Sequence, residues 1–232
     1  GNATMTDADG LLKWAPHNLL PSSEELNIWS QLGTGSLVTD NAVAPDGTTT
    51  AATFTIGSTN AFRYIRSFGT HTTGDKITFS FYVRSDTVTI LPFGINGGVN
   101  QANNVIFSDV AVTSTWNLVE FEFTVLGDDT SLYYQIGKQL HNPVNCQLGD
   151  VEIWHPHAHR SDLGGMVNNS ATGNSYVLTT SSPVYLPRVG HHVYNGSAWV
   201  NEGILHESEA RTNLISNSNT VAWTNSKITT TL

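Results

Sequence analysis

The chain has 232 residues, of which 39% are apolar and only 12% are charged, and its formal net charge is −9. Its acidic residues are scattered and it has no basic run, which argues against a nucleic-acid partner. No apolar run approaches the roughly 20 residues that span a bilayer, so we expect no membrane insertion.

The first predicted element is a boundary hairpin or linker over residues 1–17. Asp7-Ala8-Asp9-Gly10 is a typical turn sequence, Leu11-Leu12-Lys13-Trp14 follows it, and Pro16 closes the segment. The first residues lack the basic and apolar regions of a signal peptide.

A motif that begins at Asn18 and ends at Trp29 returns near the end of the chain as Asn213 to Trp223. Asn213 lies 195 positions after Asn18 (213 − 18). The lead-in sequences also agree, because Asp9-Gly10-Leu11-Leu12 has its counterpart in Glu202-Gly203-Ile204-Leu205. A repeat of this period predicts a tandem array in which residues 211–232 are the truncated start of a second unit.

Between the two copies, short runs of β-type residues alternate with Gly, Asn, Asp and Pro. Eight such runs are predicted as strands: 49–56, 61–68, 76–85, 88–95, 104–112, 116–126, 131–137 and 150–154. Many short strands with turns between them indicate a β-sandwich, which we place at residues 18–157, with at most one short helical turn near Ser22 to Leu26. The single cysteine, Cys146, is expected to be a buried apolar residue without a disulfide.

Strict alternation is clearest in two of these runs. In residues 76–84, Ile77, Phe79, Phe81 and Val83 share one face, and polar residues and Tyr82 share the other. Residues 117–125 repeat the pattern, with inward positions at Val119, Phe121, Phe123 and Val125. Each strand therefore has one core face and one solvent face.

Residues 158–210 are predicted to form a connector, because they are rich in turn residues and poor in apolar ones. Within the connector, the run from Val193 to Val200 is a hairpin with Asn195-Gly196 at its turn. Its Tyr194 and Trp199 need cover, which we expect from the sandwich or from a neighbouring chain. Segments of this kind are most stable in an oligomer, for which we expect a trimer.

Several of these segments resemble known families. The strand runs and the boundary sequences that carry the resemblance are Gly74 to Arg84, Ser114 to Thr124, Asp150 to Trp154, Asn2 to Gly10 and Glu209 to Ile215. The first three are similar to carbohydrate-binding-module jelly rolls of the galactose-binding-like type, and the last two to boundary sequences of bacteriophage tail-fibre and related virion proteins. The resemblance implies a jelly-roll module in a host-facing virion protein, but it supplies no ligand.

Saccharides are held by aromatic rings together with amide, carboxylate or guanidinium groups that reach their hydroxyls. Strand alternation places Phe62, Tyr64, Arg66 and Phe68 on one face, which is either an exposed sugar platform or a core face from which Arg66 reaches solvent.

Two further aromatic residues are candidates for the ligand site. Trp116 has the opposite parity from Val119 and would point outward, unless a β-bulge turns it into the core, which is the alternative that we favour. Tyr133 and Tyr134 alternate, so one of the pair faces solvent.

An enzyme is the rival class of protein. Glu120 and Glu122 share the wet face of one predicted strand at about 6.5 to 7 Å, which falls in the range that glycoside hydrolysis uses. Acids at this spacing on a strand are usually only solvated, and the sequence contains no nucleophile elbow, zinc-protease helix or phosphate-binding loop. We therefore expect no enzymatic activity.

Two metal sites are conceivable from the sequence. An extended backbone would aim His155, His157 and His159 in one direction, and imidazoles at that spacing can bind a transition metal, although an exposed segment that binds nothing is the alternative. Asp46 and Asp150 are loose candidates for a structural Ca²⁺ site. No other cofactor is predicted.

Together these observations predict a jelly-roll β-sandwich, a hairpin-rich connector and the start of a second repeat. The predicted function is a non-enzymatic structural or adhesion module of an extracellular phage virion, which contacts other virion proteins and contributes to recognition of bacterial surface polysaccharide. The alternative is a spacer or collar domain that binds no sugar.

Overall fold

The structure is a computed structural model that describes residues 4–58, 62–67, 69, 71–96, 105–126, 132–138, 146–162, 176–187 and 189–205. Within this part the regular elements are strands, apart from one 3-10 turn, η1 (Leu26–Ile28), which lies close to the predicted helical turn. No helix in the described part is long and apolar enough to cross a membrane.

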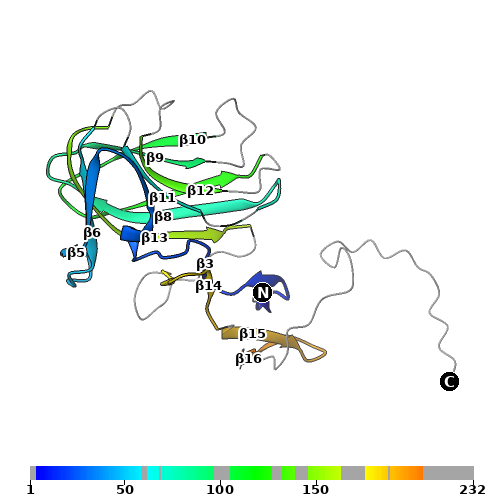
Figure 1. The fold of residues 1–232 in the computed structure, drawn as a ribbon. Coiled ribbons are helices and arrows are strands. Elements are labelled where there is room, and N and C mark those ends of the chain that lie inside the picture. Colours follow the sequence, from blue (N-terminus) through cyan, green and yellow to red (C-terminus); the bar gives the residue numbers. More distant parts are fainter. Residues whose placement is uncertain are drawn as a thin grey trace, which may run out of the picture.

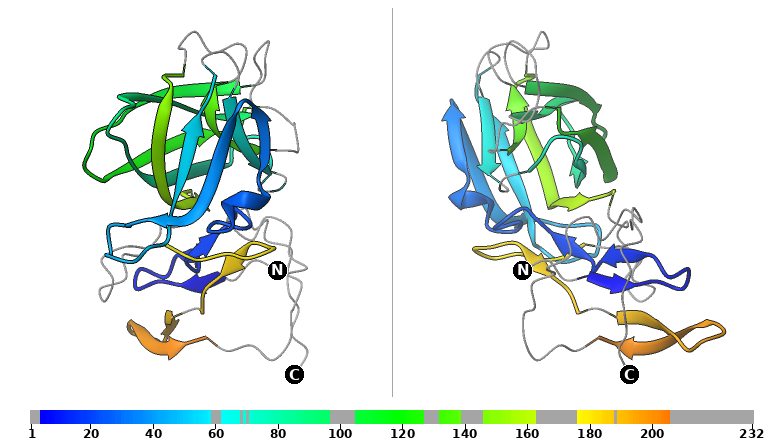
Figure 2. Two further views of the ribbon diagram at one scale, coloured as in Figure 1. Left: turned by 60° about the vertical axis from the view of Figure 1, so that its left-hand side comes forward. Right: turned by 90° about the vertical axis from the view of Figure 1, so that its right-hand side faces the viewer.

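Two antiparallel five-stranded sheets face each other in a jelly-roll sandwich (Figures 1 and 2). The first, called the β8 sheet, has the strand order β11 (Asn117–Thr124), β8 (Lys76–Arg84), β13 (Gly149–Arg160), β6 (Ala51–Ile56) and β5 (Gly35–Ala42). The second, called the β9 sheet, has the order β10 (Val105–Ala111), β9 (Ile90–Asn96), β12 (Tyr133–Lys138), β7 (Phe62–Ser67) and β4 (Ser30–Gly33). The predicted fold class is confirmed.

The eight predicted runs correspond in order to β6 through β13. The sequence prediction missed the edge strands β4 and β5. β13 is much longer than the predicted run, because it continues from Gly149 to Arg160 and passes the boundary placed at residue 157. The predicted second unit, residues 211–232, lies outside the described residues.

The core lies between the two sheets and follows the predicted alternation. Ile77, Phe79, Phe81 and Val83 of β8 are fully buried, and their neighbours on the other face are partly exposed. Phe123 of β11 is also buried, and the core cluster further contains the residues Phe54, Phe93, Tyr134, Val125, Val151 and Cys146. Cys146 is a free, buried cysteine, as expected.

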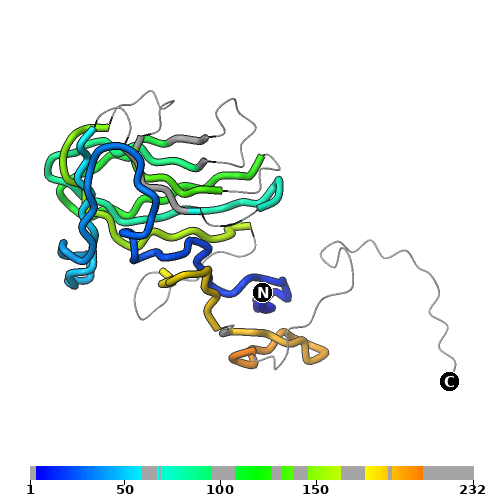
Figure 3. Tube along the Cα trace, viewed as in Figure 1, coloured from blue at the N-terminus to red at the C-terminus, as the bar shows by residue number. Residues whose placement is uncertain are grey.

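Three two-stranded ribbons accompany the sandwich. They pair β1 (Thr4–Thr6) with β2 (Leu12–Trp14), β3 (His17–Asn18) with β14 (Val184–Tyr185), and β15 (Val189–Tyr194) with β16 (Trp199–Ile204). The first and last are the boundary hairpin and the connector hairpin that the turn sequences predict. The Cα trace shows β1, at the start of the chain, close to β15, so the segments that enter and leave the sandwich lie at the same end of it (Figure 3).

The side chain of Asn18 joins three segments at this end. Its Oδ1 accepts hydrogen bonds from the backbone N–H of Leu20 (3.0 Å) and of Ala158 in β13 (3.1 Å). Its Nδ2 donates to the carbonyl oxygen of Val177 in the connector (2.8 Å). Since Asn18 is fully buried, none of these three backbone groups has water as a substitute partner.

Other residues of the repeated motif continue this contact with the connector. Ser23 Oγ is 2.6 Å from the hydroxyl of Tyr176 and accepts a hydrogen bond from the N–H of Thr179. Ser22 donates to the carbonyl of Thr180. Trp29 is buried, and its indole N–H donates to the carbonyl of Ser22 (3.0 Å). The motif therefore holds the connector against the sandwich.

Replacing Asn18 by Ala leaves two backbone N–H groups and one carbonyl buried without a partner. Each such group costs about 1–3 kcal/mol, so we expect N18A to lower the free energy of unfolding by about 3 kcal/mol. Denaturant titration measures this loss. In the control variant N117A the lost side-chain bond is an exposed one to Thr113, and the expected change is within about 0.5 kcal/mol. A loss in N18A no larger than that of N117A would contradict the role of Asn18.

Candidate functional site

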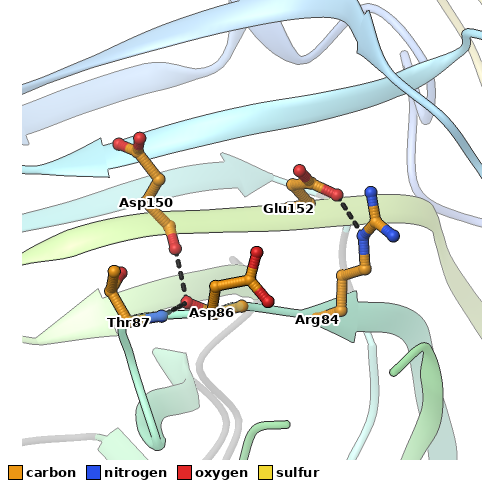
Figure 4. A pocket seen from close by; sticks show the side chains of 6 residues that line it. Arg84, Asp86, Thr87, Asp150 and Glu152 are labelled. Atoms are coloured by element: carbon orange, nitrogen blue, oxygen red, sulfur yellow. Dashed lines mark hydrogen bonds and ion pairs between the residues drawn. The ribbon is translucent and has the colours of Figure 1, made fainter. Parts of the chain in front are cut away.

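A pocket of about 230 Å³ lies on the outside of the β8 sheet, where β8 ends and the turn to β9 begins. It is lined by Arg84, Ser85, Asp86, Thr87, Asp150 and Glu152 (Figure 4). The register of β8 and β13 brings the lining together, because Arg84 and Glu152 are direct cross-strand partners. The pocket is smaller than the roughly 300–1,000 Å³ of sites for drug-sized ligands, so it suits a single small ring.

Ser85 shapes the turn that forms one wall of the pocket. Its hydroxyl donates to the carbonyl of Asp150 (2.5 Å) and accepts from the N–H groups of Thr87 (3.1 Å) and Val88 (2.8 Å). A serine that accepts from the amides two and three positions later is a common way to fix a tight turn. The turn is thereby held on β13, next to the carboxylates of the pocket.

Arg84 is fixed on two sides. Its Nε is ion-paired with Glu152 Oε2, and its guanidinium lies over the ring of Trp116, 5.0 Å from the centroid. Trp116 is held in turn, because its indole N–H donates to the carbonyl of Val43 (3.1 Å). Neither terminal nitrogen of Arg84 is hydrogen-bonded to a described residue, so the guanidinium presents oriented free donors.

The remaining polar groups of the pocket are mostly acceptors. Asp150 Oδ1 accepts from the hydroxyl of Thr55 (2.6 Å), and its other oxygen has no bond to the described residues. Asp86 is exposed, and Figure 4 shows its carboxylate between Thr87 and Arg84. With three carboxylates and one guanidinium, the pocket has a formal charge of −2, which disfavours anions and suits a neutral ligand rich in hydroxyl groups.

Trp116 belongs to an aromatic cluster on the outer face of the β8 sheet. It packs with Tyr82 around the small cluster of Trp154, Ala42, Ala44 and Ala51. The pairing of β11 with β8 is continuous from Asn117 onward, so no bulge turns Trp116 into the core, and that prediction is wrong. The simple alternation of the strand was the better guide.

The structure only partly describes the platform predicted on β7. The backbone register pairs Tyr64 with Ile136 and Arg66 with Tyr134, two residues whose side chains belong to the core face. The side chains of Phe62, Tyr64 and Arg66, and all of Phe68, lie outside the described residues.

Tyr133 and Tyr134 behave as the alternation predicts. Tyr134 is fully buried and Tyr133 is partly exposed, on the outer face of the β9 sheet. Tyr133 is therefore not near Trp116, which lies on the outer face of the opposite sheet. Sequence reasoning missed Arg84, Asp86 and Glu152 as site residues. The solvent-facing parity of Arg84 and Glu152 is readable from the strand pattern, whereas Asp86 lies in the turn after β8.

A β-bulge in β13 changes the positions of the three histidines. Without it, His157 and His159 would keep the inward parity of Val151 and Ile153. The bulge between Trp154 and His157 instead pairs His157 with Ser80 and His159 with Thr78, both on the outer face. Pro156 was the available signal, because proline inside a central strand is confined to bulges.

The prediction of one uniformly extended row is therefore wrong at His155, whose φ is 52°. The His155 ring lies between the rings of Trp154 (3.3 Å) and Tyr176 (3.6 Å), and its Nε2 is 3.2 Å from Glu24 Oε1. His157 is buried, 5.4 Å from the His159 ring. No group of three or more His, Cys, Asp or Glu in the described ranges is arranged to hold a metal ion.

The candidate calcium ligands are engaged separately. Asp46 accepts from the N–H and hydroxyl of Thr48 in its own loop, and these bonds lower its pKa. Asp150 lines the pocket described above, where it accepts from Thr55. In the described ranges, neither Asp46 nor Asp150 belongs to a group of three or more His, Cys, Asp or Glu that could hold a metal ion.

The proposed catalytic acids lie on the open outer face of β11. Glu120 is exposed opposite Ser80. Glu122 is paired with Lys76 (3.9 Å) and accepts a hydrogen bond from the hydroxyl of Ser161 (2.9 Å). Neither residue lines the pocket.

The histidines lie beneath the connector, together with His17 of β3. Burial lowers the pKa values of His17 and His155 and brings that of His157 well below its ordinary value. Burial, with repulsion from His17, lowers the pKa of His159 to about 4. The charged and titratable groups around them include Glu24, Glu122, Arg160 and Tyr176, and the imidazoles are neutral at pH 7.

The two sheets and their strand order define the class of this protein as an all-β jelly-roll sandwich. No protein-family model matches the sequence, and no curated protein matches it either. The fold is similar to tailspike protein 4 of bacteriophage CBA120, in its enzymatically active domain, with 12% identity and a TM-score of 0.46 over 62% of this chain. This chain spans 21% of that tailspike chain.

Two carbohydrate-binding modules are also similar in fold. One is TmCBM61, solved with β-1,4-galactotriose, at 14% identity and a TM-score of 0.40 over 62% of this chain and 98% of that one. The other is the xylan-binding CBM22-1 domain of Xyn10C from Paenibacillus barcinonensis, at 12% identity and a TM-score of 0.40 over 62% and 91%. Similarities at this level identify no ligand for this chain.

The buried histidines predict a stability that depends on pH. An imidazole whose pKa is lowered from about 6.5 to about 4 stabilises the fold fully above pH 6.5, and this contribution is lost as the pH falls toward 4. Between pH 6.5 and 5 each such group adds up to about 1.4 kcal/mol per pH unit to the slope of the free energy of unfolding.

We expect H159Q to show a shallower slope than the wild-type chain in that interval. Denaturant titrations at pH 7, 6.5, 6, 5.5 and 5 measure both slopes. Identical slopes for the two proteins would show that His159 does not contribute to the dependence.

Proposed function

We propose that this chain is a non-enzymatic glycan-binding module of a phage virion appendage, and that the pocket at the end of β8 is its sugar site. The observation that carries the proposal is the fixed orientation of Arg84. Its guanidinium is held between the Trp116 ring and Glu152, beside a pocket whose other polar groups are carboxylates and hydroxyls.

This arrangement fits the chemistry of sugar hydroxyls, each of which donates one hydrogen bond and accepts others. The free nitrogens of Arg84 donate, and the carboxylates of Asp86, Asp150 and Glu152 accept. Because these groups are charged, their hydrogen bonds are shorter and stronger than neutral ones. Arg84 is held before the ligand arrives, which reduces the entropy lost on binding.

The charge of the pocket narrows the class of glycan. A formal charge of −2 in the pocket and −9 for the whole chain disfavours polysaccharides rich in carboxylate, sulfate or phosphate. A neutral bacterial polysaccharide is therefore the proposed ligand. The size of the pocket supports recognition of one sugar residue, with the chain continuing over the neighbouring surface.

The role in a virion rests on sequence features. Two features support a tandem array on a host-facing appendage: the boundary sequences that resemble tail-fibre proteins and the repeated Asn18 motif. In this role the chain lies outside the cell and is assembled with other virion proteins. Three copies of the chain associate in the appendage. A spacer domain without sugar binding is the alternative function. The extensive contact between the repeated motif and the connector suits that structural role as well.

Glycan binding is tested with the full chain on an array of neutral and acidic bacterial polysaccharides, followed by titration of the best ligand. We expect R84A and W116A to weaken binding by about tenfold or more, which corresponds to about 1.4 kcal/mol. K76A removes a positive charge from the other end of the same strand and is the matched control, with unchanged affinity. No binding to any neutral glycan would favour the spacer.

The same ligand tests the enzyme alternative. Incubation of the polysaccharide with the wild-type chain and with E120Q is expected to release no reducing ends from either sample. Both proteins are expected to bind the glycan equally well, because Glu120 does not line the pocket and lies opposite Ser80, four residues before Arg84 on β8. If reducing ends appear with the wild-type chain and not with E120Q, the chain is a hydrolase that depends on Glu120, and the non-enzymatic function is wrong.

A further inference from the structure

The two copies of the lead-in sequence lie in the boundary hairpin (β1–β2) and in the connector hairpin (β15–β16). Asp9-Gly10-Leu11-Leu12 is part of the hairpin of β1 and β2, and Glu202-Gly203-Ile204-Leu205 includes the end of β16. The two glycines share an unusual backbone conformation, with φ of 79° at Gly10 and 88° at Gly203. Residues that carry a side chain rarely adopt this left-handed backbone conformation, so both positions favour glycine.

The first copy has a docked partner. The indole of Trp199, at the start of β16, lies directly on Gly10, where a Cβ atom would overlap it. The backbone N–H of Thr6 in β1 donates to Nδ1 of His191 in β15 (3.1 Å). The two hairpins therefore pack side by side, as Figures 1 and 2 show.

The second copy has no such partner among the described residues. A Cβ atom at Gly203 would meet nothing within 4 Å in the described part of the chain. The Ile204 side chain beside it is 63% exposed. Other apolar side chains on the same hairpin are also exposed, namely Val193, Tyr194 and Val200. A hairpin with this much exposed apolar surface is typical of an interaction site.

We propose that the surface at Gly203 and Ile204 is a docking site for the Trp199 indole of an identical unit. The reason is that a related short sequence, which shares its glycine and its last leucine with Glu202-Gly203-Ile204-Leu205 and has a similar φ at the glycine, already accepts this indole at Gly10. The connector hairpin (β15–β16) of each unit then binds the connector hairpin of the following unit in a tandem chain. Between two separate chains the contact requires that Trp199 first leave its own Gly10.

This contact joins two different surfaces, the Trp199 side of one hairpin and the Gly203 side of another. Such a heterologous contact can be repeated without closing, so it generates a linear series of units. The sandwich lies to one side of the hairpins (Figure 1), and in such a series the sandwiches project laterally from a row of stacked hairpins. The proposal does not depend on glycan binding.

The test frees Trp199 in the full chain. In G10V the new side chain overlaps the indole and also strains the left-handed backbone, so the β1–β2 hairpin is displaced. A second variant, T6P/G10V, also removes the N–H that donates to His191. Sedimentation velocity over a concentration series is expected to show that both variants form larger species than the wild-type chain, with masses that grow with concentration.

Adding G203V to either variant is expected to weaken this association by about tenfold or more, and adding W199A is expected to do the same. Adding G47V is the matched control, because Gly47 has a φ of 84° with nothing within 4 Å but lies in a loop of the sandwich, and association should persist. The proposal is overturned if G10V and T6P/G10V both sediment like the wild-type chain, or if G203V and G47V have the same effect.

Discussion

The buried side chain of Asn18 is the interaction on which the arrangement of the whole unit depends. Its side-chain amide forms hydrogen bonds with the segment that enters the sandwich, with the strand β13 and with the connector that leaves the sandwich. A buried amide must satisfy its own donors and acceptor as well as those of its partners, which makes this junction specific as well as stabilising. Because entry and exit are held at one end, the two boundary hairpins can meet.

How much of the fold the sequence predicts depends on where each residue's partners lie. The runs of β-type residues between turn residues are a local property, and they located eight strands, of which β8 and β11 also show the alternation of core and solvent faces. β4 and β5 were missed because they are edge strands in which most residues are exposed, so little apolar alternation marks them. The pocket could not be predicted, because the pairing of Arg84 with Glu152 is set by the register of strands distant in sequence.

The candidate site illustrates the same limit. Trp116 was identified, yet the residues that give it a role are Arg84, which lies on its ring, and Val43, whose carbonyl accepts from its indole N–H. The histidines were identified as a group, but their packing beneath the connector decides their chemistry. Burial favours their neutral form and makes them part of a structural contact, which the sequence spacing alone does not reveal.

The bulge in β13 has a consequence for how this protein can vary. After the bulge, Ala158 faces the core beside Phe79, and His157 and His159 face outward. Deleting one of the two residues 155 and 156 would remove the extra residue and let β13 pair with β8 without a bulge, with His157 still opposite Ser80 and Ala158 still opposite Phe79. A single-residue insertion or deletion elsewhere in β13, where no bulge absorbs it, would instead turn the following side chains to the opposite face of the sheet, so the length of the strand outside the bulge is under stronger constraint than its composition.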